Sequence, residues 1–210
     1  MKIALLGAES TGKTTLSLQL ADALRGRGHR VAVVGEVLRE WCEREGRTPR
    51  PEEQLPIAQE QERRVDAAAA GAGVVIADTT ALMVAIYSAM LFEDGTLYRF
   101  ALERQRTYDF TLVTGLDLPW VADGLQRDGP HVREPVDALV REALAKAQVP
   151  YRVVYGSGPG RLAQAMAAIG LAQDPVRQPA WKAQCDRCSD PDCEHRLFAR
   201  LLTPAPTSTP

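Results

Sequence analysis

Five short, mostly apolar runs punctuate the chain, and longer segments with helical periodicity separate them. Runs of about four apolar residues bounded by turn residues are typical of buried strands. The runs occupy residues 3–6, 31–34, 74–77, 110–113 and 151–154. Strands of a parallel sheet are buried on both faces and therefore read as continuous rather than alternating apolar runs. The pattern predicts an α/β fold with a five-stranded, mostly parallel sheet flanked by helices.

Helical periodicity marks the segments between these runs and after the last one. We expect helices up to residue 25 and over residues 37–45, 51–70, 82–92, 98–105, 135–146 and 158–168. Apolar positions are expected at Leu16, Leu18, Leu20 and Leu24 in the first helix and at Leu55, Ile57, Ala58 and Val65 in the long polar one. Right-handed crossovers between parallel strands place a ligand at the carboxyl ends of the strands.

The chain divides into one large domain and a short tail. Residues 1–170 hold all the predicted strands and are expected to form a single domain. Residues 171–184 contain two prolines and read as a linker to a Cys- and His-containing tail at residues 185–202. Residues 203–210 contain three prolines and are expected to be disordered.

Composition narrows the class of protein further. The chain has 210 residues, of which 45% are hydrophobic and 25% charged, with a formal net charge of −2. These values are ordinary for a globular protein and give no basic footprint for nucleic acid. The longest apolar stretch, residues 77–92, contains Asp78 and is too short and too polar to cross a membrane. No basic segment typical of a signal peptide precedes the first run, so we expect a cytoplasmic protein.

The clearest chemical signal is Gly-Ala-Glu-Ser-Thr-Gly-Lys-Thr at residues 7–14, a complete G-x-x-x-x-G-K-[ST] phosphate-binding loop. These letters could occur by chance in a turn, but a predicted strand precedes them and a predicted helix follows, as the motif requires. Backbone N–H groups of such a loop face phosphate oxygens. Lys13 is expected to reach the β- and γ-phosphates of ATP, and the Thr14 hydroxyl to bind Mg²⁺. The expected nucleotide contacts are Gly7, Glu9, Ser10, Thr11, Gly12, Lys13, Thr14 and Thr15.

Two acidic residues follow predicted strands at the edge where the ligand is expected. Asp78 comes after Val-Val-Ile-Ala, which has the form of a Walker B motif, and is expected to bind Mg²⁺. The alternative use of Asp78 is as a cap for the following helix, and the two uses are compatible. Glu36 follows the second strand and is a candidate base near the acceptor hydroxyl. Its alternative is a solvated charge at the start of a helix.

Residues 116–133 are rich in Gly, Pro and Asp and are expected to form a loop or lid after the fourth strand. In small kinases this region closes over the triphosphate and brings in an arginine. Arg127, as a catalytic residue, and Arg133, as a nucleotide contact, are the candidates, because a guanidinium binds phosphate oxygens in a bidentate manner. The alternative is that both are exposed surface arginines.

Several motifs occur together in a characteristic order. They are GAESTGKTTL from Gly7, GEVLRE from Gly35, IADTT from Ile76, YDFTLV from Tyr108, W-V-x-D-G-x-x-R from Trp120 and V-P-Y-x-x-V from Val149. In this order they resemble the ribosylnicotinamide kinase domain of NadR-type proteins, often described as NadR-like AAA-family ATPases. The phosphate loop alone is not specific, so the lid pattern and Glu36-x-x-Arg39-Glu40 carry most of the resemblance. It spans about residues 1–170.

The resemblance implies a P-loop kinase fold and transfer of the ATP γ-phosphate to the 5′-hydroxyl of nicotinamide riboside, a step of NAD metabolism. It implies that Lys13 and Thr14 serve ATP and Mg²⁺. Glu36 or Asp78 would contact the ribose and its hydroxyl, and Arg127 would belong to the lid. Family members can have Asp-Thr-Asp where this chain has Asp-Thr-Thr after its third strand.

The expected partners are therefore ATP and a small nucleoside acceptor, with nicotinamide riboside preferred. A kinase for another nucleoside or nucleotide is the alternative among enzymes. A regulatory ATPase that switches with its bound nucleotide and signals through the tail is the alternative from another class. The acceptor site distinguishes them, because a kinase needs a closed pocket beside Glu36 and Asp78, covered by the helix over residues 51–70.

Cysteines gather in the C-terminal tail. Cys185-x-x-Cys188-x4-Cys193-x-His195 offers three thiolates and one imidazole within a short segment. Zn²⁺ prefers tetrahedral sets of nitrogen and sulfur ligands, so these residues are expected to hold one structural Zn²⁺ with no open position. Coincidental clustering and redox-active thiols are the alternatives. Cys42 lies in a predicted helix and reads as a small apolar side chain.

Overall fold

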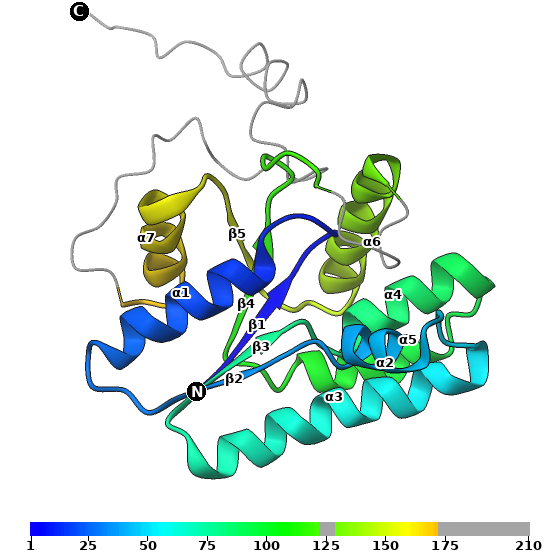
Figure 1. Cartoon of the computed structure of the whole chain (residues 1–210), viewed down its shortest axis with the longest axis horizontal. Helices are drawn as coiled ribbons and strands as arrows, with labels where there is room; N and C mark the ends of the chain where they lie inside the picture. Colours follow the sequence, from blue (N-terminus) through cyan, green and yellow to red (C-terminus); the bar gives the residue numbers. More distant parts are fainter. Residues whose placement is uncertain (122–128, 172–210) are drawn as a thin grey trace, which may run out of the picture.

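The computed structural model describes residues 1–121 and 129–171, which form an α/β domain of three layers (Figure 1). Within this part of the chain, five strands form one sheet in the order β2-β3-β1-β4-β5, and every neighbouring pair is parallel. The predicted α/β fold with a five-stranded parallel sheet is therefore confirmed. The strands are β1 (Lys2–Leu6), β2 (Val31–Val34), β3 (Val74–Asp78), β4 (Phe110–Thr114) and β5 (Arg152–Val154).

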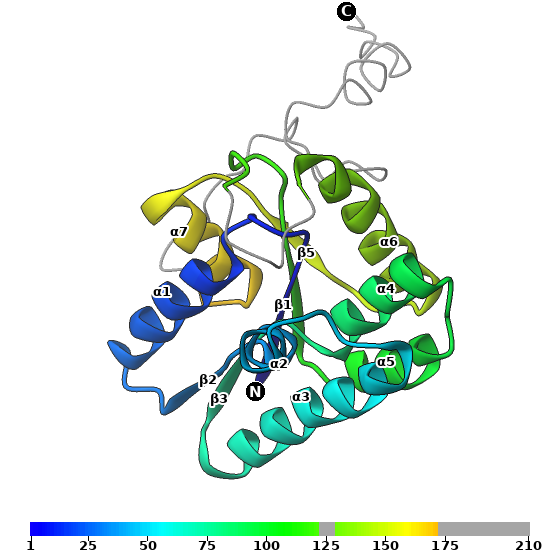
Figure 2. The same ribbon diagram turned by 45° about the vertical axis from the view of Figure 1, so that its right-hand side comes forward.

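Helices cover both faces of the sheet. They are α1 (Lys13–Arg25), α2 (Val37–Glu45), α3 (Pro51–Gly71), α4 (Ala81–Phe92), α5 (Leu97–Gln105), α6 (Arg133–Lys146) and α7 (Gly158–Ala168), with a 3-10 turn η2 (Pro130–Val132) before α6. The helices α1 and α7 pack together on one face, whereas α3, α4, α5 and α6 lie on the other. Figure 2 shows these two groups on opposite sides of the strands.

Alternate residues of β1 face the two helical layers. Ile3 and Leu5 pack with apolar residues of α1 and α7. Ala4 packs with α3, and Leu6 packs with α4 and α6. All four side chains are fully buried, as expected for the central strand of a sheet that is covered on both faces. Because β1 is buried on both faces, its sequence is a continuous apolar run.

Two of the expected apolar positions are wrong. Leu16, Leu20 and Leu24 recur every four residues and are buried in α1. Leu18 lies two residues away from this row, which is about 200° around the helix, and is 52% exposed. In α3, Leu55 is likewise 42% exposed. Both leucines stand on the solvent side of helices whose buried faces are set by other residues.

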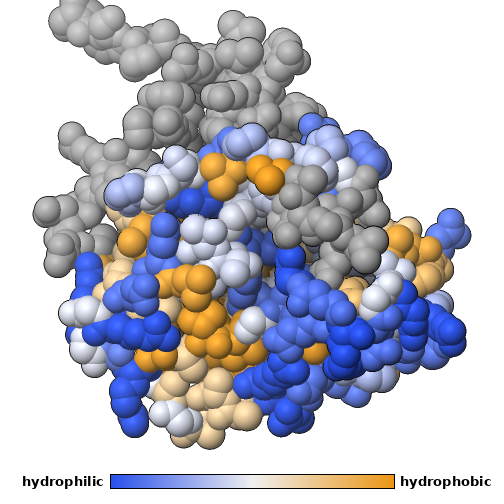
Figure 3. Space-filling view, in the orientation of Figure 1, coloured by the Kyte–Doolittle hydropathy of each residue, from blue (hydrophilic) through white to orange (hydrophobic). Residues whose placement is uncertain are grey.

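The longest apolar stretch of the chain is explained by burial within the domain. It runs from the end of β3 into α4, a helix of 12 residues that packs against α3, α5 and α6. None of the helices in the described part of the chain is both long and apolar enough to span a membrane. On the face drawn in Figure 3 hydrophilic residues predominate among the described ones, and apolar residues gather most visibly left of its centre.

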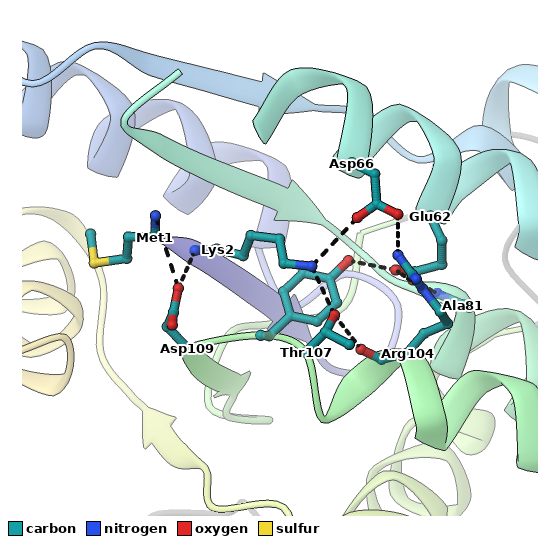
Figure 4. Close-up of polar contacts among 9 residues, drawn as sticks. Met1, Lys2, Glu62, Asp66, Ala81, Arg104, Thr107 and Asp109 are labelled. Carbon is teal, nitrogen blue, oxygen red and sulfur yellow. Dashed lines mark hydrogen bonds and ion pairs between the residues drawn. The ribbon is translucent and has the colours of Figure 1, made fainter. Parts of the chain in front are cut away.

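A polar network ties the start of β1 to α3 and α5 (Figure 4). Lys2 Nζ donates to Thr107 Oγ1 at 2.8 Å and to Asp66 Oδ1 at 3.5 Å. Asp66 also pairs with Arg104 of α5. Because β1 leads directly into the phosphate-loop motif, the network fixes the strand on which that loop is mounted.

Glu62 of α3 extends this network to the first turn of α4. Its Oε1 accepts the Ala81 N–H at 2.9 Å, and its Oε2 accepts the Tyr108 hydroxyl at 3.2 Å and lies 3.5 Å from Arg104 Nε. Burial raises the pKa of the Glu62 carboxyl, although these donors favour the charged form. Since Ala81 begins α4 shortly after Asp78, Glu62 fixes the turn that follows β3.

Candidate functional site

The residues of the phosphate-loop motif form a turn between β1 and α1, at the carboxyl end of the central strand. Gly12 adopts a left-handed conformation (φ 71°, ψ 27°) just before the first turn of α1. Thr11 is fully buried, and its Oγ1 lies 2.7 Å from Ala8 O and 2.6 Å from Thr114 Oγ1 at the end of β4. These hydrogen bonds anchor the loop backbone to the end of β4.

Arg161 of α7 is a second anchor, which the sequence analysis did not identify. The residue is 4% exposed, and its guanidinium donates to Thr11 O at 2.6 Å and to Gly156 O at 2.9 Å. Burial lowers the pKa of this guanidinium and the charge of Asp117 raises it, but an arginine remains charged at neutral pH. A positive charge is thereby held beside the loop that is expected to bind phosphate.

Lys13 lies in the first turn of α1 with its ammonium group against the loop. Its Nζ donates to Gly7 O at 3.0 Å and to Ala8 O at 2.8 Å. The side chain is half-buried and lines two cavities. The ammonium group therefore stands where a phosphate group could take over the bonds that it now makes to two carbonyl oxygens.

Gly7 occupies a position that a larger residue does not fit. Its φ is 144°, and a Cβ there would lie 2.1 Å from Thr114 Oγ1 and 3.1 Å from Thr114 O. We expect Gly7→Ala to lower the free energy of unfolding by about 1–3 kcal/mol because it overpacks the loop, measured by urea denaturation. Gly28→Ala is the control, since Gly28 has a φ of 84° and a Cβ there would meet nothing within 4 Å. Equal losses in the two variants would contradict the steric argument.

Glu36 follows β2 and faces the same cavity as the phosphate loop. It forms an ion pair with Arg39, whose Nη2 and Nε lie 3.1 Å and 3.3 Å from Glu36 Oε2, and its side chain is 13% exposed. Gln61 of α3 holds this turn, because its Oε1 accepts the Val37 N–H at 2.9 Å and its Nε2 donates to Gly35 O at 3.2 Å. Glu36 is thus a largely buried, oriented carboxylate rather than a solvated charge.

Asp78 ends β3 and is 3% exposed. The helix-cap alternative is wrong, because Thr80 caps α4 and its hydroxyl accepts the Leu82 N–H at 3.2 Å. Between them, Thr79 has a φ of 84°, a strained conformation for a β-branched residue. Asp78 Oδ1 is buried and has no hydrogen-bond partner among the described residues. A buried carboxylate oxygen is costly unless a ligand or water satisfies it.

Two cavities meet at Lys13, Glu36 and Arg39, which line both. The larger has a volume of about 490 Å³, and its other lining residues include Ser10, Thr11, Gly12, Thr14, Thr15, Gly35 and Asp78. The smaller has a volume of about 110 Å³ and is mostly apolar, with lining residues that include Glu9, Leu38, Cys42, Gln54, Tyr87, Met90 and Val136. Burial raises the pKa of the Cys42 thiol, in keeping with a small apolar side chain. The two cavities are therefore neighbours that share three wall residues.

Thr14 and Asp78 are the residues of the larger cavity that suit Mg²⁺. Both line it, and both offer the oxygen ligands that Mg²⁺ prefers. The buried Asp78 Oδ1 without a protein partner fits such an ion, which takes its remaining ligands from phosphate and water. Among the residues that the structure describes, no group of three or more His, Cys, Asp or Glu side chains is arranged to hold a metal ion.

Arg133 is not an exposed surface arginine. It begins α6, is 8% exposed, and donates from Nη2 to Leu116 O at 3.1 Å and to Leu118 O at 2.8 Å. Burial lowers the pKa of its guanidinium. In this structure Arg133 therefore holds the segment that follows β4, and its contact with a phosphate stays a prediction.

The phosphate loop also contacts both flanks of the segment that the structure leaves undescribed. Ser10 Oγ accepts the Val121 N–H at 2.7 Å, and Glu9 Oε1 accepts the Gly129 N–H at 3.3 Å. Arg127 lies between these flanks, outside the described residues. The predicted zinc ligands also lie outside them, and they are Cys185, Cys188, Cys193 and His195. The catalytic lid arginine and the Zn²⁺ site therefore stay predictions.

A family model described as an AAA domain matches residues 2–161. No curated protein matches the chain significantly. Solved structures, however, share its fold. A NadR protein in complex with NR has a TM-score of 0.67 and 18% identity, over 84% of this chain and 52% of that chain. A NadR protein in complex with NAD and AMP-PNP has a TM-score of 0.61 and 19% identity, over 84% of this chain and 51% of that chain.

A deoxyadenosine kinase from M. mycoides with bound dCTP has a TM-score of 0.55 and 17% identity, over 81% of this chain and 99% of that chain. The chain spans about half the length of the NadR chains that it matches. The likeness extends over most of this chain and is one of fold. The predicted resemblance to the P-loop kinase domain of NadR-type proteins is confirmed at that level.

Proposed function

The chain belongs to the AAA domain family. We propose that it is an ATP-dependent kinase that transfers the ATP γ-phosphate to a hydroxyl group of a nucleoside. The observation that carries this proposal is the meeting of two cavities of different chemistry at Lys13, Glu36 and Arg39. The larger, polar cavity suits a triphosphate, and the smaller, apolar cavity suits a nucleobase. A switch that only binds and hydrolyses a nucleotide needs no second cavity.

Each of the site residues has one task in this proposal. Backbone N–H groups of the loop and Lys13 bind the β- and γ-phosphates, and Thr14 and Asp78 hold the Mg²⁺ that neutralises phosphate charge. Glu36 accepts the proton of the acceptor hydroxyl as the hydroxyl oxygen bonds to the γ-phosphorus and the bond from that phosphorus to the bridging oxygen of ADP breaks. Arg39 keeps the Glu36 carboxylate oriented through their ion pair. The products are ADP and a phosphorylated nucleoside.

Nicotinamide riboside is the acceptor that we propose, with its 5′-hydroxyl as the reacting group. The order of motifs along the chain supports this choice, and so does the fold shared with NadR in complex with NR. Glu36 and Arg39 belong to the GEVLRE motif that carries much of the resemblance, and both line the junction of the cavities. In this role the chain would serve NAD salvage. A kinase for another nucleoside is the second candidate, favoured by the fold shared with a deoxyadenosine kinase.

ADP release in the presence of a panel of nucleosides tests the proposed function. The panel contains nicotinamide riboside, deoxyadenosine, adenosine, cytidine and uridine, each with ATP and Mg²⁺. We expect nicotinamide riboside to raise the rate of ADP release most strongly, and mass spectrometry to identify its 5′-phosphate. A larger effect of another nucleoside would favour the second candidate. ATP hydrolysis that no nucleoside accelerates would contradict the kinase and favour a regulatory ATPase.

A further inference from the structure

Gln54 of α3 is a buried polar residue at the wall of the smaller cavity. It is 1% exposed, and its Nε2 donates to Pro49 O at 3.4 Å. A carbonyl oxygen only accepts hydrogen bonds, so Pro49 requires the Gln54 amide to face it with nitrogen rather than oxygen. Gln54 Oε1 is left with no hydrogen-bond partner among the described residues.

An unsatisfied amide oxygen in such surroundings calls for a donor. Most neighbouring residues of the cavity wall are apolar, among them Leu38, Met90, Leu91 and Val136. Buried polar groups in proteins are paired in the great majority of cases, and the exceptions are often sites that a water or ligand completes. No described residue supplies that donor, whereas the cavity that Gln54 lines could admit one.

The size of the cavity limits what can carry that donor. Its volume is about 110 Å³, somewhat below the roughly 150 Å³ of an apolar cavity that holds one benzene ring. The cavity therefore has less room for the two fused rings of a purine than for one six-membered ring. Tyr87 in the wall offers an aromatic surface for such a ring.

We infer that Gln54 determines acceptor specificity: its Oε1 accepts a hydrogen bond from an N–H group on a single-ring base. This inference rests on the proposed function and deepens it. The base would be a primary carboxamide, as in nicotinamide, or an exocyclic amine, as in cytosine. A base that presents only oxygen acceptors at this point would face Gln54 Oε1 with like partial charges and would be rejected. A carboxylate has no hydrogen to donate at this point and would be rejected in the same way; the charged residues of the wall, Glu9, Glu36, Lys13 and Arg39, balance in sign.

Matched acceptor pairs test the inference. In the first pair, nicotinamide riboside carries an amide where nicotinic acid riboside carries a carboxylate. In the second pair, cytidine carries an amine where uridine carries a carbonyl. We expect the wild-type kcat/KM to favour the donor-bearing member of each pair by about tenfold or more, the value of one well-placed hydrogen bond. Gln54→Leu should bring the ratio for cytidine over uridine close to one. Gln54→Glu, which keeps an acceptor oxygen, should retain the preference for the donor.

Controls separate specificity from folding. Gln59→Leu makes the same change at an exposed position of α3 and should leave both ratios unchanged. Thermal unfolding of each variant shows whether it is folded. A purely structural role for Gln54 would lower kcat/KM for every acceptor alike in both Gln54 variants, and unchanged ratios in Gln54→Leu would overturn the inference.

The failure of the proposed function has a different signature. If no nucleoside accelerates ADP release by the wild type, the kinase proposal fails. Calorimetric titration with nicotinamide riboside and cytidine then tests whether Gln54 contacts a bound nucleoside. Binding that Gln54→Leu weakens about tenfold and Gln59→Leu leaves unchanged would support the role of Gln54 as a ligand contact. No binding of either nucleoside to the wild type would overturn that role as well.

Discussion

Lys13→Ala is expected to lower the rate of phosphoryl transfer by about 10²–10³-fold, because it removes a positive charge from the phosphates in the transition state. The fold should survive the change. The loop backbone is anchored independently, by the buried Thr11 hydroxyl and by Arg161, whose guanidinium donates to Thr11 O at 2.6 Å. The Lys13 side chain is only half-buried, so its truncation removes little packing.

Circular dichroism and ADP release, measured on the same preparation, check this prediction. Lys146→Ala is the matched control, because Lys146 is an exposed lysine at the end of α6 that pairs with Glu142 on the surface. It should retain both the fold and the rate. A Lys13→Ala protein with wild-type turnover would show that the loop does not bind the reacting phosphates, and a loss of the circular dichroism signal would mean that Lys13 is structural.

Local sequence patterns predicted the sheet and most of the helices because burial on both faces leaves a mark on each strand. The observed bounds of α2 and α7 agree with the predicted ranges, 37–45 and 158–168, where Gly residues flank or open the helix. Errors arose where one apolar residue was assigned to a face by composition alone. Leu18 shows this, because Leu16, Leu20 and Leu24, spaced four residues apart, occupy the buried row of α1 and Leu18 lies outside that row.

The arrangement of the candidate site could be predicted in part, because topology alone brings strand ends together. The phosphate loop, Glu36 and Asp78 each follow a strand, and the parallel order β2-β3-β1 places them around one cavity. Gln54 and Arg161 could not be found in this way. Each is a polar residue within a helix, and its hydrogen-bond partner is known only from the tertiary structure. Arg161 and its partner Thr11, for example, lie at opposite ends of the domain sequence.

Asp78→Asn and Glu36→Gln are both expected to reduce phosphoryl transfer strongly, the first through Mg²⁺ and the second through the acceptor hydroxyl. General base catalysis contributes about 10²–10⁴-fold, which sets the expected loss for Glu36→Gln. Asp78→Asn should weaken the affinity for Mg²⁺, so an excess of Mg²⁺ should restore part of its activity. Both changes keep the shape of the side chain. The first removes a carboxylate that lines only the larger cavity, and the second removes one at the junction of the two cavities.

Titration calorimetry with a non-hydrolysable ATP analogue, at several Mg²⁺ concentrations, separates the two roles. Glu36→Gln should bind the analogue as the wild type does, whereas Asp78→Asn should bind it more weakly at low Mg²⁺ than at high Mg²⁺. Glu43→Gln on the exposed side of α2 and Asp22→Asn on α1 are the matched controls, since both side chains face solvent. If Glu36→Gln weakened binding of the analogue as much as Lys13→Ala does, Glu36 would belong to the nucleotide site. The ion pair between Glu36 and Arg39 would then help to bind the phosphates rather than orient a base for the acceptor hydroxyl.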